Sequence, residues 1–201
     1  MAETEAAAAG RVISRRVDGR LVRGLGAGAP EAVTELCERF GPKLDRFVQA
    51  WLVGDGRAAE EVTILALLDA VRNVVRFDPR RSSFPAWLYG IARRKVHDEL
   101  RRQRRRKSVP TSAQVSLESL AEARAPEDMA DVLSSRIDAQ RQVAALATVL
   151  SGVEFEVLVL SCVEQFSAPE IGRIVGRSGR AIHSILHRAR QKARERLAHD
   201  G

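Results

Sequence analysis

A cationic stretch at residues 93–107 carries the side chains whose chemistry is easiest to read in this chain of 201 residues. It holds nine Lys or Arg against two acids, a local charge of +7. The whole chain is also +7, so the remaining residues sum to zero. Asp98 and Glu99 cannot neutralise nine cations, as the partners on a solvated charged helix face would, and this favours an external polyanion. The sequence pI of about 10.3 favours nucleic acid over an acidic membrane surface.

Two aromatic residues, Trp87 and Tyr89, precede this stretch in a chain whose aromatic content is only 4%. Aromatic faces and arginine planes both stack on unpaired bases, so the pair is compatible with a single-stranded ligand. Packing in a hydrophobic core is the alternative, and it is the interpretation that we favour for Trp87.

A second group of polar side chains lies in residues 166–197. Ser167 is placed to cap a short helix with Glu170 completing a capping box, and Gly176 and Ser178 mark a turn and a second cap. The next helix repeats polar residues at i, i+3, i+4, i+7 and i+8, on one face. These residues are Arg180, His183, Ser184, His187 and Arg188. Such a face on the second helix of a helix-turn-helix suits the major groove of duplex DNA.

Two other interpretations of residues 166–197 are weaker. A plain helical hairpin would need neither the two caps nor the glycine in so short a turn. His183 and His187 have the i, i+4 spacing of a metal-binding pair, but no third ligand lies nearby in the sequence.

The elements that position these groups are all predicted to be helices, in two small domains at residues 18–107 and 132–198. Apolar residues recur at helical spacing through both ranges. Gly and Pro at positions 24–30 and 41–42 predict helix breaks. Residues 108–131 contain five acids against one Arg, with Ser, Ala and two Pro, which predicts an acidic flexible linker. Residues 1–17 are expected to be a disordered tail.

The helix predicted within residues 58–76 is apolar on nearly all sides, with Val, Ile or Leu at eight positions. An amphipathic surface helix would show a polar side. This helix therefore either lies at the centre of a bundle or offers apolar surface to a partner, and the first arrangement is the commoner one.

The sequence predicts a binding protein and not an enzyme, with no cofactor and no metal. It has no Gly-rich phosphate loop, no clustered carboxylates and no nucleophile near a base. Cys37 and Cys162 lie far apart without a C-x-x-C pattern, so we expect two small buried residues in a reducing cytoplasm. No apolar run approaches the roughly 18 residues of a membrane span, and the first residues lack a signal-peptide core, which predicts a cytoplasmic protein.

The segment at residues 77–107 resembles region 2 of the extracytoplasmic-function (ECF) sigma factors of bacterial RNA polymerase, in the sigma-70 family. The matching residues are Phe77, Asp78, Arg80, Phe84, Ala86, Trp87, Leu88, Ile91, Ala92, Arg93, Asp98, Arg101 and Arg102. The resemblance implies a domain that binds polymerase and the minus-ten promoter element. The residues implied for the minus-ten element are Asp78, Arg80, Arg81, Trp87, Arg93, Arg94, Lys95, His97 and Arg101. Arg94 stands where many members carry asparagine beside a flipped promoter base.

Residues 166–197 resemble region 4.2 of the same family. The matches are Glu170, Ile171, Gly176, Ser178, Ser184, Leu186, Arg188, Ala189 and Arg190. The resemblance implies that the second domain reads the minus-thirty-five element through Arg177, Ser178, Arg180, His183, Ser184, His187 and Arg188. The sequence departs from the family at Arg180, Ala181 and His183, which bears on the bases that are read.

The helix within residues 58–76 is similar to the family helix that docks on the β-prime clamp helices of polymerase. The residues implied for this contact are Glu60, Glu61, Ile64, Leu65 and Leu68. Ile64 and Leu65 replace a polar pair that normally faces the polymerase. The implied partners are core RNA polymerase, through its β-prime clamp helices and β flap, and promoter DNA. Whether an anti-sigma factor also binds stays open.

The hypothesis that accounts for both blocks is therefore an all-α, two-domain sigma factor that starts transcription by directing polymerase to specific promoters. An ordinary helix-turn-helix regulator that acts without polymerase core is the alternative. It explains residues 166–197 but leaves residues 77–107 unexplained.

Overall fold

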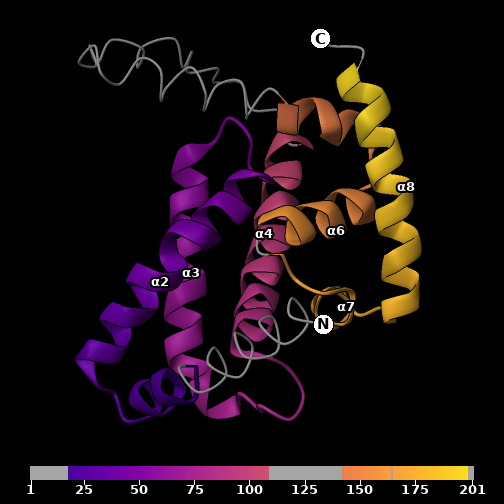
Figure 1. Ribbon diagram of the computed structural model, residues 1–201. Coiled ribbons are helices and arrows are strands. Elements are labelled where there is room, and N and C mark those ends of the chain that lie inside the picture. The colour runs from indigo at the N-terminus through magenta and orange to yellow at the C-terminus, as the bar shows by residue number, and fades with distance from the viewer. Residues whose placement is uncertain (1–17, 109–141, 164, 199–201) are drawn as a thin grey trace, which may run out of the picture.

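The computed structural model describes residues 18–108, 142–163 and 165–198, and every regular element in these residues is a helix (Figure 1). Residues 18–26 and 142–149 are helical, and the other elements are α2 (Pro30–Gln49), α3 (Gly56–Asn73), the 3-10 helix η1 (Val74–Arg76), α4 (Phe84–Ser108), α6 (Gly152–Val163), α7 (Ala168–Val175) and α8 (Gly179–Ala198). The predicted all-α fold is confirmed. The expected tail at 1–17 and nearly all of the expected linker lie outside the described residues.

One predicted helix break is wrong, because α2 runs without interruption through Gly41 and Pro42. Pro42 has no N–H to bond to the preceding turn, which costs helix stability. Burial on both sides of the proline offsets this cost, since Leu36, Phe40 and Leu44 form one apolar stripe at helical spacing. Tertiary packing thus decides the outcome against local propensity.

Helix α3 buries small residues and turns larger ones outward. Its buried stripe consists of Ala58, Ala59, Val62, Thr63, Ala66 and Ala70. Small side chains at a helix contact allow close approach of the axes, and α3 packs against both α2 and α4. The larger residues Ile64, Leu65 and Leu68 are exposed. Of the two arrangements expected for this helix, the structure therefore has the one with apolar surface toward solvent.

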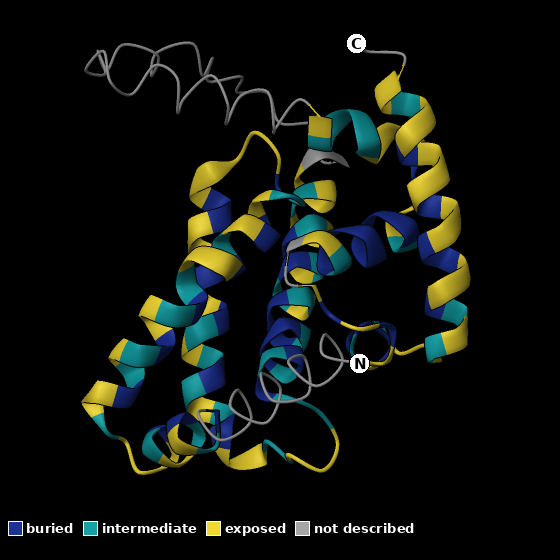
Figure 2. Ribbon diagram, viewed as in Figure 1, coloured by how far each residue is buried: buried dark blue, intermediate teal, exposed yellow. Residues whose placement is uncertain are grey.

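Helix α4 is the long central helix, with α3 on one side and α7 on the other (Figure 1). Ser83 caps its start, where the hydroxyl oxygen accepts a hydrogen bond from the Ala86 amide at 3.4 Å, as the sequence predicts. Because two sets of helices pack on α4, buried residues line more than one of its faces (Figure 2). They are Phe84, Ala86, Leu88, Tyr89, Ile91, Ala92, Val96 and Glu99.

The C-terminal half contains the helix-turn-helix that the sequence predicts. Ser167 and Glu170 form a capping box at the start of α7. Gly176 ends α7 in the left-handed region with a φ of 73°, and the Ser178 hydroxyl accepts from the Ala181 amide at 3.3 Å at the start of α8. All the signals that build this motif lie within a dozen or so residues of one another, so the sequence is sufficient to place them.

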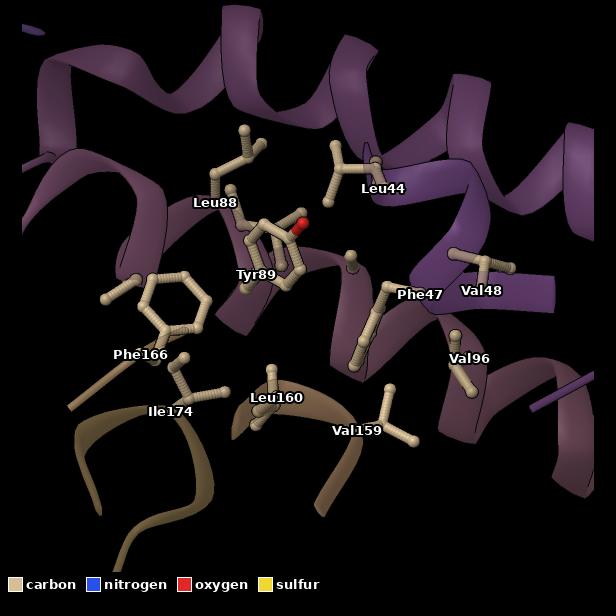
Figure 3. Packing of buried hydrophobic residues seen from close by; sticks show 14 of the residues in the cluster. Leu44, Phe47, Val48, Leu88, Tyr89, Val96, Val159, Leu160, Phe166 and Ile174 are labelled. Atoms are coloured by element: carbon tan, nitrogen blue, oxygen red, sulfur yellow. The ribbon is translucent and has the colours of Figure 1, made fainter. Parts of the chain in front are cut away.

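The N-terminal and C-terminal halves share one hydrophobic core. Figure 3 shows side chains of α2, α4, α6 and α7 meeting around Tyr89. The rings of Tyr89 and Phe166 pack edge to face with centroids 5.1 Å apart, and so do those of Trp51 and Phe155, also at 5.1 Å. These contacts hold the two halves against each other across α4.

The expectation that both cysteines are buried is wrong. Cys37 of α2 and Cys162 of α6 are exposed. Each lies one or two positions from a fully buried leucine, Leu36 and Leu160, and so falls on the solvent side of its helix.

Candidate nucleic-acid and protein interfaces

Helix α8 presents one polar face to solvent. Its buried side consists of Ile182, Ile185, Leu186, Ala189 and Ala193, which pack on α6 and α7. The opposite side exposes the residues predicted for the minus-thirty-five element, which are Arg180, His183, Ser184, His187 and Arg188. Arg177 and Ser178 are exposed in the turn before them. The structure therefore brings five of the seven predicted residues to one face of α8 and the other two to the turn that leads into it.

Glu154 of α6, which the sequence analysis missed, pairs with two basic residues of α8. The Lys192 ammonium lies 2.9 Å from Glu154 Oε2, and Arg188 Nε lies 3.8 Å from Glu154 Oε1. The hydrogen bond from Lys192, followed by those from Ser151, lowers the pKa of Glu154 from 4.5 to about 2. Ser151 and Glu154 have the S-x-x-E spacing of a capping box, and this spacing could have identified the start of α6.

The turn before α4 is shaped by Asp78. Its carboxylate accepts from the Arg80 amide at 2.8 Å, and its carbonyl accepts from the Arg81 amide at 3.1 Å. Both arginine side chains are exposed. Asp78 therefore stabilises the turn through its hydrogen bonds. Arg80 and Arg81 are exposed and available to bind an external anion.

The cations of α4 fall into two sets. Arg94 and Arg101 are exposed, and Arg101 also lies 3.3 Å from Asp98 one turn away. Lys95 is half-buried and pairs with Asp69 of α3 at 2.6 Å. Arg93 is half-buried as well, and it donates to the Glu156 carboxylate of α6. A sequence-level charge count cannot separate the two sets, because both paired carboxylates come from other helices.

Trp87 and His97, also predicted for the minus-ten element, lie against other rings. Trp87 is half-buried, and its ring lies 5.5 Å from that of Phe77 and 5.7 Å from that of Phe84. This packing agrees with the core interpretation favoured for Trp87. His97 lies 5.5 Å from the Trp51 ring, and its Nε2 is 3.7 Å from Glu156.

An exposed aliphatic surface runs along α3. We call it the α3 patch, and it consists of Ile64, Leu65 and Leu68, with exposed fractions of 49%, 39% and 44%. Glu60 and Glu61 are exposed at its N-terminal end. A groove between α2 and α3 adjoins it, lined by Gly41, Pro42, Asp45, Gln49, Gly56, Glu60, Thr63 and Ile64. An apolar surface with an acidic rim is typical of a protein interface.

Among residues 18–108, 142–163 and 165–198, no three His, Cys, Asp or Glu side chains lie close enough together to hold a metal ion. In the same residues, no helix is both long and apolar enough to cross a bilayer.

The two parts of the chain that carry these surfaces match known protein families. Residues 36–106 match Sigma-70 region 2, and residues 140–192 match Sigma-70, region 4. RNA polymerase sigma factor CarQ of Myxococcus xanthus is 33% identical over 173 residues, which cover 85% of this chain and 91% of CarQ. ECF RNA polymerase sigma factor SigD of Mycobacterium tuberculosis is 30% identical over 179 residues, 87% of this chain and 81% of SigD.

Two solved structures are similar in fold. CnrH, in complex with the cytosolic domain of CnrY, superimposes with a TM-score of 0.68 at 23% identity, covering 92% of this chain and 99% of CnrH. The sigma factor RpoE from Bartonella quintana, in complex with the anti-sigma factor NepR, gives a TM-score of 0.60 at 26% identity and covers 84% of this chain and 98% of RpoE.

Proposed function

Because this chain belongs to the ECF sigma factors of the sigma-70 family, we propose that it directs core RNA polymerase to promoters through three separate surfaces. The α3 patch binds the polymerase clamp. The turn at residues 78–83 and the exposed cations of α4 hold the minus-ten element, and α8 reads the minus-thirty-five element. The protein acts by binding, without a catalytic step of its own, and it works in the cytoplasm where the polymerase is.

The contrast between the exposed faces of α3 and α8 carries this proposal. Three aliphatic side chains lie together on α3, and a continuous polar face runs along the second helix of a helix-turn-helix. Aliphatic surface is buried favourably against another protein, whereas hydrogen-bonding side chains on such a helix suit base edges in the major groove. A regulator that binds DNA alone would have no use for the α3 patch.

The residues at the minus-ten surface divide by role. Arg80, Arg81, Arg94 and Arg101 are exposed, which suits contacts to a strand of promoter DNA. Asp78 shapes the turn by accepting from the Arg80 amide, and Lys95 is paired with Asp69 of α3, so both have structural roles at this surface. We assign this surface to a domain at residues 18–107, and the minus-thirty-five surface to a second domain at residues 132–198.

An inhibitory partner is part of the proposal. RpoE of Bartonella quintana is bound by the anti-sigma factor NepR, and CnrH by the cytosolic domain of CnrY. The similarity of this chain to both supports a comparable protein partner that holds it inactive.

Transcription in vitro tests the proposed function. The full chain is added to core polymerase on a library of promoter fragments, and RNA is sequenced from its 5′ ends. The proposal expects transcripts that start at a fixed distance from a shared pair of elements. Stable duplex binding without association with core polymerase would support the regulator instead.

A further inference from the structure

The C-terminal half contacts Arg93 and His97 of α4, two further residues that the family resemblance implies for the minus-ten element. The Arg93 guanidinium donates from Nε and Nη2 to the two carboxylate oxygens of Glu156, with the Nη2–Oε2 distance at 3.1 Å. His97 Nε2 lies 3.7 Å from the same carboxylate. At the other end of the contact, the Ser83 hydroxyl donates to Glu170 of α7 at 3.1 Å.

The buried carboxylate of Glu156 is paired with residues of the N-terminal half and not with any described residue of its own half. It lies on α6, whose residues from 153 to 160 are otherwise apolar apart from Glu154, and it is only 1% exposed. A carboxylate buried to this degree needs compensating cations. Both of the basic side chains recorded beside it, Arg93 and His97, belong to α4 in the other half.

Aromatic contacts between the two halves lie on either side of the Arg93–Glu156 ion pair. Trp51 packs on Phe155, the residue next to Glu156, and it also packs on His97. Tyr89 packs on Phe166 one helical turn before Arg93. Arg93 therefore sits in a partly desolvated setting, where a bidentate charge-assisted pair is strong.

We propose that this contact is autoinhibitory: Glu156 occupies Arg93 and His97 in the free chain, and promoter DNA displaces it when the two halves separate. A carboxylate and a phosphate both offer two oxygens to a guanidinium, so the exchange replaces one anion by another. The α3 patch and the polar face of α8 are exposed in the closed form. A closed chain can thus dock on polymerase before the α4 surface is released.

The inhibitory role rests on the proposed assignment of α4 to the minus-ten element, but the closed contact itself does not. The chain supplies a direct probe for the contact. It has two cysteines, Cys37 in the N-terminal half and Cys162 in the C-terminal half, and both are exposed. Spin labels on the two thiols of the otherwise unmodified full chain report the separation of the halves by pulsed electron paramagnetic resonance.

The first comparison is between Glu156→Ala and Glu195→Ala. Both variants remove one carboxylate from the C-terminal half, but Glu195 is exposed on α8, whereas Glu156 is buried beside Arg93. We expect one narrow distance distribution for the wild type and for Glu195→Ala, and a broad distribution with longer distances for Glu156→Ala. Circular dichroism confirms that each variant is folded. The double variant Arg93→Glu with Glu156→Arg restores an ion pair, and we expect it to restore the narrow distribution.

The second measurement is binding of short single-stranded DNA of mixed sequence to the free chain. Glu156→Ala is expected to bind about tenfold more tightly than Glu195→Ala. A tenfold difference means that about one tenth of the molecules with an intact Glu156 contact are open and able to bind DNA at any moment. A distance distribution unchanged by Glu156→Ala would overturn the closed contact and leave the assignment of α4 untouched. Separation of the halves without tighter binding would overturn the inhibitory role and count against that assignment.

Discussion

Helices α3 and α8 are built on the same plan but turn opposite chemistry toward solvent. Each buries a stripe of alanine and aliphatic residues against its own half of the molecule. Outward, α3 shows Ile64, Leu65 and Leu68, whereas α8 shows imidazole, hydroxyl and guanidinium groups. The buried stripes explain why both segments are helices, and only the exposed faces distinguish their partners.

This difference implies two kinds of binding that experiments can separate. Contact through the α3 patch buries apolar area, so it depends weakly on salt. Contact through α8 and the cations around it releases counterions from DNA, so its affinity falls steeply with salt, with a log–log slope of about −0.9 per phosphate contacted. A sigma factor needs both, and losing one should leave the other intact.

Gly172→Ala is expected to have the largest effect, and it acts on the helix-turn-helix that positions α8. A Cβ at Gly172 would lie 2.5 Å from the carbonyl oxygen of Arg177, a backbone atom of the helix-turn-helix turn. The turn must shift to accept it, and we expect a loss of about 3 kcal/mol in the stability of the C-terminal half, at the upper end for overpacking. Duplex binding should be lost, while binding to core polymerase through α3 is retained.

Gly152→Ala is the matched control for that change. Gly152 begins α6, and apart from its chain neighbours and the backbone of its own helix no heavy atom of the described residues lies within 4 Å of the position of its Cβ. Alanine there should be neutral or stabilising by up to about 1 kcal/mol. Chemical denaturation of the two variants checks the contrast, and equal stability of Gly172→Ala and Gly152→Ala would contradict the packing of the turn.

Ile64→Gln tests α3 with the next largest effect. Ile64 is 49% exposed, so the stability of the free chain should change by no more than about 0.5 kcal/mol. Binding to core polymerase should weaken by about 1.5–3 kcal/mol, the value of a buried aliphatic side chain. Duplex binding and its salt dependence should not change.

Val62→Gln, two residues earlier on the same helix, gives the opposite pattern. Val62 is 4% exposed in the core of the N-terminal half, and a buried amide without partners destabilises the fold. Thermal unfolding and a polymerase pull-down on both variants separate core from interface. A large drop in Tm for Ile64→Gln would move the docking surface away from the α3 patch.

His183→Ala tests the polar face of α8. Loss of one base-edge contact should cost about 1–3 kcal/mol on the preferred promoter and relax the choice of base at one position. Arg194→Ala, exposed about one turn before the end of α8, should instead weaken binding evenly across sequences. Selection from a promoter library measures both, and unchanged base preference for His183→Ala would remove it from the reading face.

The sequence predicted what is encoded locally. Ser167, Glu170, Gly176 and Ser178 form caps and a turn within a dozen residues, and each is found in its predicted role. Arg93 and Glu156 are 63 residues apart in the sequence, and no periodic pattern predicts that they pair. Cationic residues on α4 could therefore be counted in advance, but the structure was needed to say which of them are exposed.

Packing also overruled two local expectations. The continuation of α2 through Pro42 depends on a core to which α3 and α4 contribute, so a Gly-Pro pair read alone predicts the wrong boundary. The helix within residues 58–76 has too many apolar residues to show which face is inward. The small residues Ala59, Ala66 and Ala70, with Val62 between them, form the buried face, and the larger Ile64, Leu65 and Leu68 remain exposed.

Glu154→Gln tests how the two helices are held, with the smallest expected effect. Glu154 fixes α8 through Lys192, and this pair lowers the pKa of the carboxyl from 4.5 to about 2 in the folded chain. Its stabilisation is therefore fully present above pH 4.5 and is lost as the pH falls toward 2. The wild type should be more stable than Glu154→Gln near neutral pH, by less than about 1 kcal/mol because Lys192 is exposed. This difference in stability should disappear as the pH falls from 4.5 toward 2.

Other carboxylates titrate equally in both proteins, so the difference in stability reports on the Glu154–Lys192 pair. No such closing gap is expected between the wild type and Ile64→Gln, since Ile64 carries no ionisable group and its substitution leaves the Lys95–Asp69 pair of α3 intact. A constant difference between wild type and Glu154→Gln from pH 5 to pH 2 would mean that α8, like α3, is positioned by its buried stripe.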